Sequence, residues 1–453
     1  MAWRTTQSPT AARHGASAMA PDDATDELLR PELTAQLDSI GRADIVVGIP
    51  SYNNAHTIGH VVRAVSAGLA KYYHDCACVV VNADGGSSDG TRDIALQVDT
   101  GSRQTLLLSH NSRPLHRLST GYLGVPGKGT ALRTIFAAAA RLGAHATAVV
   151  DSDLRSISPE WIELLIGPIL REKMDYVAPL YQRHKYDGTI TNNLVYPLTR
   201  ALYGQRVRQP IGGDFGMSGS LAAHFLGGEA WETDVARYGI DIWMTTRALA
   251  DGYRVAQSYL GAKIHDTKDP GADLTAMFTQ VIGTVFDLVG RYQQVWRATS
   301  GSREVPTFGF RYTVGVEPVQ VNVERMINIF RQGAHELMGV WQQMLSAETC
   351  SALAHTAAAT AGPFDLPAAL WVRAVYEAAV SYHRRTLARS HLLKALIPLY
   401  LGRTAGFVLQ TANAGADDVE TEIEALCVMY ESLKPYLVER WDRQGAATRA
   451  EHP

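Results

Sequence analysis

Hydrophobic and polar positions between residues 44 and 181 alternate between short apolar runs and amphipathic stretches. The apolar runs, rich in Val, Ile and Leu, lie at residues 44–50, 76–84, 104–110, 146–150 and 175–181. Helical spacing of apolar residues characterises the stretches between them, for example residues 57–73 and the segment after Lys128. Continuous apolar strands that alternate with helices predict an α/β domain with a mostly parallel sheet and helices on both faces.

The pattern changes at both ends of the chain. From about residue 274 the strand patterns almost disappear, and long helical stretches such as residues 366–400 continue to the C-terminus. The first residues lack periodicity until a short helix expected near 26–37, and they lack the apolar core of a signal peptide. We therefore predict a largely disordered tail over 1–41, the α/β domain over 42–285 and a helical region over 286–453.

Composition narrows the function classes. Lys and Arg number 42 against 45 Asp and Glu, so the net charge of -3 offers no basic excess for nucleic acid or an anionic membrane. Four cysteines without CxxC spacing fit a reducing cytoplasm. The apolar stretch 392–410 is interrupted by Lys394 and Arg403, so no stable membrane insertion is expected. These features predict a soluble, cytoplasmic protein.

Polar and glycine-rich segments follow three of the predicted strands. They are GIPSYNN (48–54), NADGGSSDGT (82–91) and Asp151-Ser152-Asp153. Each segment alone is more typical of a turn or of solvated acids before a helix. Open parallel sheets bind ligands at the carboxyl ends of their strands, so three such ends in one domain favour a nucleotide site.

The acid pair and two other residues suggest phosphate and metal chemistry. Two acids one residue apart can place one carboxylate on a divalent cation and the other on a ribose, and Mg²⁺ or Mn²⁺ prefers such oxygen ligands. Lys128 lies between glycines at a helix start, which suits a phosphate, although Tyr122 and Gly129 break the Walker A pattern. His265 alone is typical of a locally bonded strand-end residue, but with the acids it completes a mixed nitrogen and oxygen metal site.

Seven segments carry a family resemblance. In chain order they are GIPSYNNAHTIGHVV, NADGGSSDGT, GKGTALR, VVDSDL, PIGGDFGMSG, YGIDIWMTTRAL and AKIHDTKDPG. Over approximately residues 44–285 the ordered set resembles GT-A nucleotide-sugar glycosyltransferases, and more narrowly the retaining glucosyl-3-phosphoglycerate synthase and glucosylglycerate synthase group. The resemblance implies a Rossmann-like GT-A domain that binds an NDP-sugar.

The resemblance also implies roles for individual residues. Nucleotide-sugar contacts would come from Pro50, Ser51, Tyr52, Asn54, Asp84, Lys128, Asp151, Ser152, Gly212 and Gly213. Asp153 and His265 would hold Mg²⁺ or Mn²⁺. Lys128, Asp153 and Asp241 would carry the chemistry, with Asp241 replacing the group's usual Glu by a side chain one methylene shorter.

The expected acceptor site departs from the group's pattern. The phosphoglycerate enzymes carry a segment resembling GGRVT, whereas residues 187–193 read DGTITNN, which keeps Thr191 but places Thr189 at the arginine position. A phosphate dianion favours a guanidinium, so the loss of arginine favours D-glycerate over 3-phosphoglycerate, with Thr189, Thr191 and Asn192 as contacts. Alternatively, Arg183 or Lys185 supplies the missing charge from the preceding loop.

The sequence therefore predicts metal-dependent, retaining transfer of glucose from UDP- or GDP-glucose to D-glycerate, forming glucosylglycerate. Three other enzymatic functions remain open: glucosyl-3-phosphoglycerate synthesis, mannosyl transfer to glycerate, and inverting transfer to a polyprenyl phosphate. A non-catalytic nucleotide-sugar-binding scaffold is the alternative of another class. The helical region must bury its apolar faces on the catalytic domain or across a symmetric interface, and we expect a homodimer.

Overall fold

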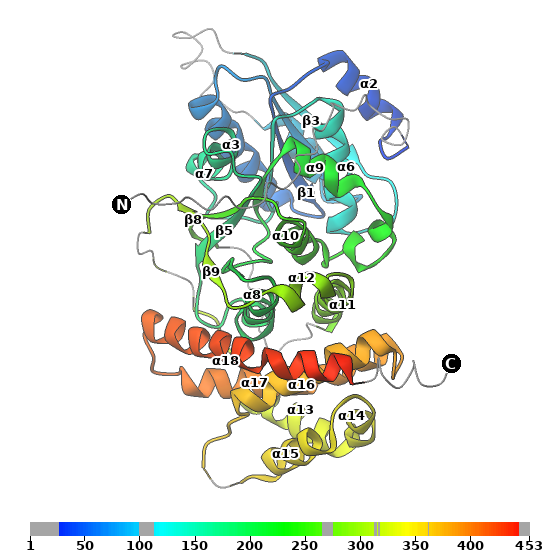
Figure 1. Ribbon diagram of the computed structural model, residues 1–453. Helices are drawn as coiled ribbons and strands as arrows, with labels where there is room; N and C mark the ends of the chain where they lie inside the picture. The colour runs from blue at the N-terminus through cyan, green and yellow to red at the C-terminus, as the bar shows by residue number, and fades with distance from the viewer. Residues whose placement is uncertain are drawn as a thin grey trace, which may run out of the picture.

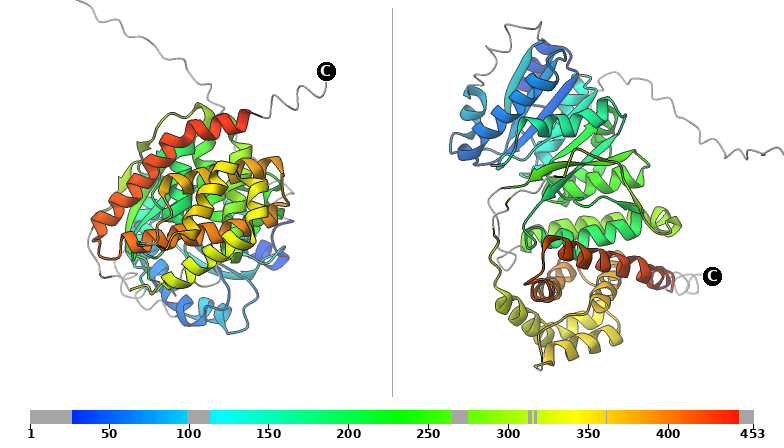
Figure 2. Two further views of the ribbon diagram at one scale, coloured as in Figure 1. Left: turned by 90° about the horizontal axis from the view of Figure 1, so that it is seen from below. Right: turned by 90° about the vertical axis from the view of Figure 1, so that its left-hand side faces the viewer.

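The computed structural model describes residues 27–98, 113–264, 275–311, 315, 318–360 and 362–443. The molecule is elongated, with the sheet domain at one end and the C-terminal helices at the other (Figures 1 and 2). Helices α8, α11 and α12 lie between these two parts in both side views. The site described below lies where the sheet domain faces this middle layer.

The main sheet has eight strands in the order β10-β8-β5-β7-β4-β1-β2-β3, and only β7 runs antiparallel to its neighbours. This confirms the mostly parallel sheet. Its strands are β1 Ile45–Ser51, β2 Cys78–Asp84, β3 Leu115–Gly121, β4 Ala146–Val149, β5 Tyr176–Gln182, β7 Phe215–Ser218, β8 Val255–Ala262 and β10 Thr307–Phe308. A separate pair joins β6 Gln205–Arg206 to β9 Arg303–Glu304.

The third strand is not where the hydrophobic pattern indicates it. The apolar run at residues 104–110 lies outside the described residues, and the strand beside β2 is β3. Six of the seven β3 residues are only partly buried because the strand forms the sheet edge, so it lacks the continuous apolar signal of a central strand. The two-residue strands β9 and β10 are likewise too short to leave a pattern.

Helices cover both faces of the sheet, as predicted. Val46 of β1 shares one core with Ile135 of α6, and Val47 shares the other with Val61 of α3. Gly48 lets α6 approach closely, because a Cβ there would lie 2.3 Å from Ile135 Cγ2. The helices of this domain are α2 Pro31–Ile40, α3 Ala55–Tyr72, α4 Thr91–Gln97, α6 Lys128–Arg141, α7 Pro159–Leu170, α9 Gly219–Leu226 and α10 Ile240–Ala250, with short 3-10 turns at Glu229–Glu232 and Asp234–Ala236.

The middle and C-terminal layers are helical. They comprise η1 Thr191–Val195, α8 Tyr196–Tyr203, α11 Thr275–Arg291, α12 Gln293–Ala298, α13 Val323–Glu336, α14 Met338–Met344, α15 Ala347–Ala358, α16 Ala368–Arg384, α17 Arg389–Gln410 and α18 Ala416–Asp442. The predicted boundary between residues 285 and 286 falls inside α11. The short helix expected near 26–37 corresponds to α2, whose Leu33 and Leu37 are buried in the core of the sheet domain.

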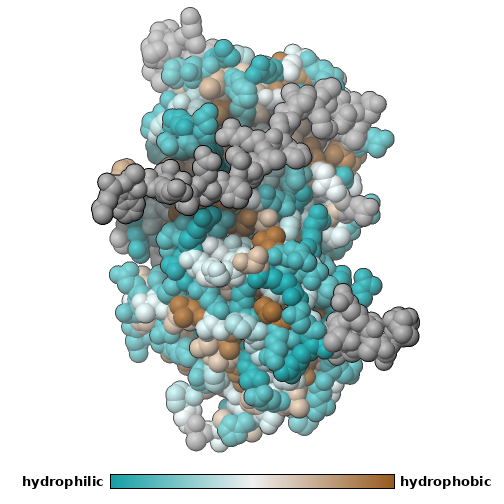
Figure 3. Space-filling model, in the orientation of Figure 1, coloured by the Kyte–Doolittle hydropathy of each residue, from teal (hydrophilic) through white to brown (hydrophobic). Residues whose placement is uncertain are grey.

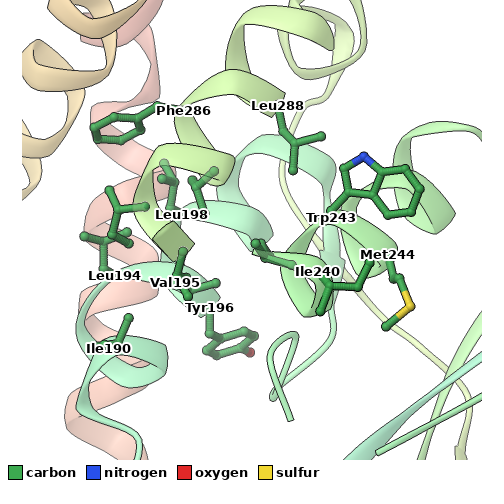
Figure 4. Packing of buried hydrophobic residues seen from close by; sticks show 14 of the residues in the cluster. Ile190, Leu194, Val195, Tyr196, Leu198, Ile240, Trp243, Met244, Phe286 and Leu288 are labelled. Atoms are coloured by element: carbon green, nitrogen blue, oxygen red, sulfur yellow. The ribbon is translucent and has the colours of Figure 1, made fainter. Parts of the chain in front are cut away.

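The helical region packs onto the sheet domain through one continuous apolar core. Figure 4 shows part of it, where Leu194 and Leu198 from the η1–α8 segment lie near Phe286 of α11. Arg200 of α8, only 1% exposed, reinforces the contact by donating to Glu424 and Glu431 of α18. The chain therefore buries the helices' apolar faces by itself.

The face of the molecule shown in Figure 3 gives no separate reason for a dimer. On the face shown in Figure 3, hydrophobic residues form scattered spots among polar ones. Among the described helices, α17 alone is long and apolar enough to cross a membrane, and 83% of its apolar window is buried inside the protein. The homodimer stays a prediction.

Candidate functional site

Two lysines and three aspartates meet at the carboxyl ends of β4 and β8. We call Lys128, Asp151, Asp214, Asp241 and Lys263 the lysine–aspartate cluster. Lys128 is the first residue of α6, Asp241 lies in the first turn of α10, Asp151 follows β4, Asp214 precedes β7, and Lys263 follows β8. Three carboxylates thus face two ammonium groups in a largely buried space.

The Lys128 ammonium contacts three acceptors. Its Nζ lies 2.8 Å from Asp151 Oδ1, 3.1 Å from Asp241 Oδ1 and 3.2 Å from the Gly213 carbonyl oxygen. Burial alone would lower the pKa of Lys128, but the carboxylates of Asp151 and Asp241 outweigh burial and raise it. Lys128 is therefore a fixed positive charge at the start of α6.

The Lys263 ammonium is held in the same way on the other side of Asp151. Its Nζ lies 2.7 Å from Asp151 Oδ2, 2.8 Å from Asp214 Oδ2 and 2.8 Å from the Gly212 carbonyl oxygen. Burial opposes the charge, yet the two carboxylates raise the pKa of Lys263. Since an ammonium has three protons, all donors of Lys263 are used inside the protein.

The aspartates differ in how well they are paired. Burial would raise the pKa of Asp151, but the two lysines together hold it below its ordinary value. Burial does raise the pKa of Asp241, because Lys128 compensates only part of the desolvation. Asp241 Oδ1 is buried and accepts no hydrogen bond of good geometry, although it lies 3.1 Å from Lys128 Nζ. Asp241 therefore retains capacity to accept a ligand hydroxyl.

Gly213 lets the backbone pass between the charged groups. Its φ is +96°, and a Cβ would lie 2.2 Å from Asp151 Oδ2 and 2.6 Å from Lys263 Nζ. Gly212 is equally confined, since a Cβ there would lie 2.2 Å from Pro179 Cγ. The structure thus brings both predicted glycines into the site, where their carbonyl groups bind the lysines.

Asp84 organises the glycine-rich loop after β2. Its Oδ1 accepts from the backbone N–H groups of Gly86 and Ser87, at 2.9 and 2.8 Å. Its Oδ2 accepts from the hydroxyls of Ser87 and Ser51, at 2.6 and 3.1 Å. Gly86 has φ +89°, a conformation that favours glycine. Asp84 and Ser51 therefore shape the loop, whether or not they also contact a base.

The first and fourth strand ends are linked beside this loop. Ser152 Oγ donates to Asn54 Oδ1 at 2.8 Å, and Thr57 Oγ1 donates to the Ser152 carbonyl oxygen at 2.8 Å. Pro50 and Ser51 end β1, and the following Tyr52 is 63% exposed. An exposed aromatic ring beside a glycine loop is suited to stacking on a planar base. The predicted nucleotide residues thus line one edge of the sheet.

The two predicted metal ligands differ in how far the structure describes them. Asp153 is partly buried, two residues beyond Asp151, whereas His265 lies outside the described residues. The described chain stops at Ile264, whose carbonyl oxygen accepts from Arg155 N at 2.9 Å and whose N–H donates to Ser156 Oγ at 2.9 Å. The residue before His265 is therefore bonded to the segment that follows Asp153.

The bonding of Asp151 and the donor types of Asp153 and His265 bear on this metal site. Both carboxylate oxygens of Asp151 are already bound to lysines, Oδ1 to Lys128 and Oδ2 to Lys263. A carboxylate with an imidazole is a donor set that fits Mn²⁺ or Mg²⁺. Within the described part of the chain, no three His, Cys, Asp or Glu residues form a metal-binding group.

The predicted acceptor residues lie on and before the π-helix η1. The Thr189 hydroxyl lies 2.6 Å from the Tyr400 hydroxyl and is buried, and Asn192 Oδ1 accepts from Arg208 Nη1 at 3.0 Å. Arg183 Nη2 lies 3.4 Å from the Gly212 carbonyl oxygen. Thr191 lies near Arg183, since a Cβ on Gly188 would be 3.8 Å from both side chains. Arg183 therefore reaches the glycine backbone that binds the lysines, and Thr191 lies near Arg183.

Lys185 is turned away from this region. Its ammonium donates to the carbonyl oxygens of Thr411, Ala412 and Ala414 at 2.7, 3.0 and 3.2 Å. Those three bonds use every donor of the side chain. Of the two basic residues considered for the missing acceptor charge, only Arg183 lies beside the glycines of the site.

The sequence pattern missed Lys263, Asp214 and Tyr181, whose hydroxyl donates to Asp214. Lys263 does follow a predicted strand, two residues before His265, so the strand-end rule could have indicated it. Its role depends on two aspartates from other strands, which spacing along the chain does not reveal.

Comparisons with known proteins match part of the chain. Residues 46–219 match the family model described as Glycosyl transferase family 2. No curated protein matches. Glucosyl-3-phosphoglycerate synthase from Mycobacterium tuberculosis, in complex with Mg²⁺ and UDP, is 25% identical over 56% of this chain and 83% of its own, with a TM-score of 0.40. The same enzyme with Mn²⁺, UDP and glucosyl-3-phosphoglycerate is 24% identical over 62% and 87%, with a TM-score of 0.39.

Proposed function

We propose that this chain, a glycosyltransferase by the family 2 domain over residues 46–219, transfers glucose from an NDP-glucose to D-glycerate with retention of configuration. The observation that carries the proposal is the lysine–aspartate cluster at the carboxyl ends of the strands. It offers a cation for a diphosphate and a carboxylate for a sugar at neighbouring positions. The ordered motifs that resemble the glucosylglycerate and glucosyl-3-phosphoglycerate synthases support the substrate class.

The diphosphate site centres on Lys128. As the first residue of α6, it combines its own charge with the partial positive charge of the helix start. All three Lys128 donors are used in the resting structure, and the contacts with Asp241, at 3.1 and 3.3 Å, are longer than the 2.8 Å contact with Asp151. A bound diphosphate would therefore replace Asp241 as a partner of Lys128.

That replacement would free Asp241 for the sugar. Its Oδ1 already accepts no well-formed hydrogen bond, and a hydroxyl donor would relieve the cost of a buried carboxylate. Binding of the diphosphate and of the hexose would thus be coupled through one aspartate.

A carboxylate with an imidazole is a donor set that fits a divalent cation, and Asp153 and His265 would hold it. When bound, it would neutralise the charge that develops on the departing diphosphate. Lys128 would act at the same group from the helix side. By the resemblance to the retaining group, the acceptor would attack on the face that the diphosphate leaves, and we assign no covalent nucleophile.

The acceptor carboxylate would bind Arg183. This guanidinium lies over the Tyr181 ring at 5.2 Å and donates toward the Gly212 carbonyl oxygen, but it shares its charge with Asp187 Oδ2 at 3.6 Å. Arg208, the next basic group, is held by both carboxylate oxygens of Glu420 at 2.8 and 3.0 Å. A single carboxylate suits one partly neutralised guanidinium better than a phosphate dianion does.

We therefore expect a higher kcat/KM for D-glycerate than for 3-phosphoglycerate under the same metal and donor conditions. Arg183→Gln should lower kcat/KM for glycerate by about 10- to 100-fold, the usual effect of losing a charge-assisted hydrogen bond. Asp187→Asn should lower the ratio of kcat/KM for D-glycerate to kcat/KM for 3-phosphoglycerate, because it leaves Arg183 with its full charge. Steady-state kinetics with both acceptors measure this. A clear preference of the unmodified enzyme for the phosphorylated acid would contradict the acceptor assignment.

A further inference from the structure

The C-terminal helices reach the acceptor side of the site directly. We call residues 185–193 the acceptor segment, since they contain or adjoin the expected acceptor contacts. All three long C-terminal helices, α16, α17 and α18, lie against the layer that holds this segment (Figures 1 and 2). The contacts are specific hydrogen bonds from buried side chains as well as apolar packing.

Trp371 and Tyr400 make two of these buried bonds. Trp371 Nε1 of α16 donates to the Asn193 carbonyl oxygen at 2.8 Å, and the Tyr400 hydroxyl of α17 lies 2.6 Å from Thr189 Oγ1. Trp371 is 0% exposed and Tyr400 is 1% exposed. The Tyr400 ring packs on Phe278 of α11 at 4.9 Å, which restricts its own movement. Both side chains are thus rigid supports.

Further hydrogen bonds hold the two ends of the acceptor segment. At its start, Lys185 binds three carbonyl groups after α17, and the Tyr186 hydroxyl donates to the Val408 carbonyl oxygen at 3.2 Å. At its end, the Tyr430 hydroxyl of α18 lies 3.4 Å from the Asn193 carbonyl oxygen. The segment is therefore held along its length by parts of the chain that follow it by more than 170 residues.

The local backbone explains why such support matters. Residues Thr191–Val195 form a π-helix, closed by a bond from Tyr196 N to the Thr191 carbonyl oxygen. A π-turn is rare and is found often at functional sites. Thr191 and Asn192 lie on this turn, so their direction depends on what holds it.

We infer that the C-terminal helices position the acceptor segment for acceptor binding, with Trp371 and Tyr400 as positioning residues. The inference rests on the proposed function for the identity of the acceptor. It gives the helical region a role in acceptor recognition, while the donor site on the sheet domain depends on other contacts. Changes to these two residues should therefore affect the acceptor and spare the donor.

A matched pair of double variants of the full chain tests this. Trp371→Phe/Tyr400→Phe removes the indole N–H and the phenol hydroxyl that form hydrogen bonds to the segment. The control, Trp341→Phe/Tyr382→Phe, removes two donors of buried side chains, 0% and 4% exposed, whose partners, the Ala395 carbonyl oxygen and Asp287, lie elsewhere. Both variants change the same residue types, so general destabilisation should be similar.

Hydrogen–deuterium exchange and kinetics give the two readouts. In the first variant, amides of residues 189–195 should exchange about tenfold faster, and the acceptor KM should rise about tenfold, the effect of losing roughly one buried hydrogen bond. The donor KM should stay within about twofold, and the control should change neither acceptor readout. The inference would be overturned if the amides of residues 189–195 exchanged equally fast in both double variants. It would also be overturned if Trp371→Phe/Tyr400→Phe left the acceptor KM unchanged. Absence of any glucosyl transfer by the unmodified chain would instead refute the proposed function, while exchange would still decide whether the helices hold the segment.

Discussion

Asp153→Ala, or excess EDTA added to the unmodified enzyme, is expected to reduce glucosyl transfer by about 10²- to 10³-fold, because the departing diphosphate loses its main electrostatic stabilisation. Asp151 cannot replace Asp153, since Lys128 and Lys263 occupy both of its oxygens. His265→Ala should show the same loss. Initial rates of NDP release measure the effect, and added Mg²⁺ or Mn²⁺ should restore the EDTA-treated enzyme.

Asp75→Ala is the matched control for this change. Asp75 is exposed and precedes β2, so it lies at the amino edge of the sheet, opposite the site. Its replacement should leave transfer within about twofold of the unmodified rate, as expected for a surface change far from the chemistry. Undiminished turnover in excess EDTA would contradict the metal assignment.

Lys263→Met should destabilise the fold by about 3–5 kcal/mol, the usual cost of leaving buried carboxylates without their cation. The side chain of Lys263 is 4% exposed and that of Asp214 is 0% exposed, so water cannot replace the lost ammonium. Asp151 would retain only Lys128, and the Gly212 carbonyl would lose its 2.8 Å bond and keep only the longer contact with Arg183 at 3.4 Å. Urea denaturation followed by circular dichroism measures the loss in the free energy of unfolding.

A surface lysine provides the comparison. Lys71 pairs with Glu160 at 2.9 Å, but the two side chains are 54% and 50% exposed. Lys71→Met should therefore cost far less stability than Lys263→Met. Lys263→Arg, which keeps the charge, should recover part of the stability lost in Lys263→Met. Equal stability of Lys263→Met and Lys71→Met would show that the buried cluster is not a stabilising unit.

The central strands and their functional ends could be predicted because each leaves a local signal. Continuous Val and Ile mark β1 and β2, and the acids and glycines after them follow from where parallel sheets bind ligands. The edge strand β3 was missed because its residues are mostly half-exposed. Local pattern therefore predicts buried elements better than those at an edge.

The partners within the site could not be predicted, because they depend on which strands become neighbours. Lys263 reaches Asp151 only because of the strand order in the sheet, where β5, β7 and β4 lie, in that order, between β8 and β1. Thr189 was expected at the acceptor, yet its hydroxyl bonds Tyr400 from a helix more than 200 residues later. Such contacts follow from the packing of the C-terminal helices, for which the amphipathic pattern indicates burial but no specific partner.

Release of NDP is the most direct test of the proposed function. The full chain would be mixed with UDP-glucose or GDP-glucose, D-glycerate and Mg²⁺, and NDP and the glucosylated acid would be quantified together. We predict NDP release that requires both glycerate and the divalent cation, with one glucosylglycerate formed per NDP and with the anomeric configuration of the donor retained. NDP-glucose that binds the chain but stays intact with every acceptor and cation would contradict the account.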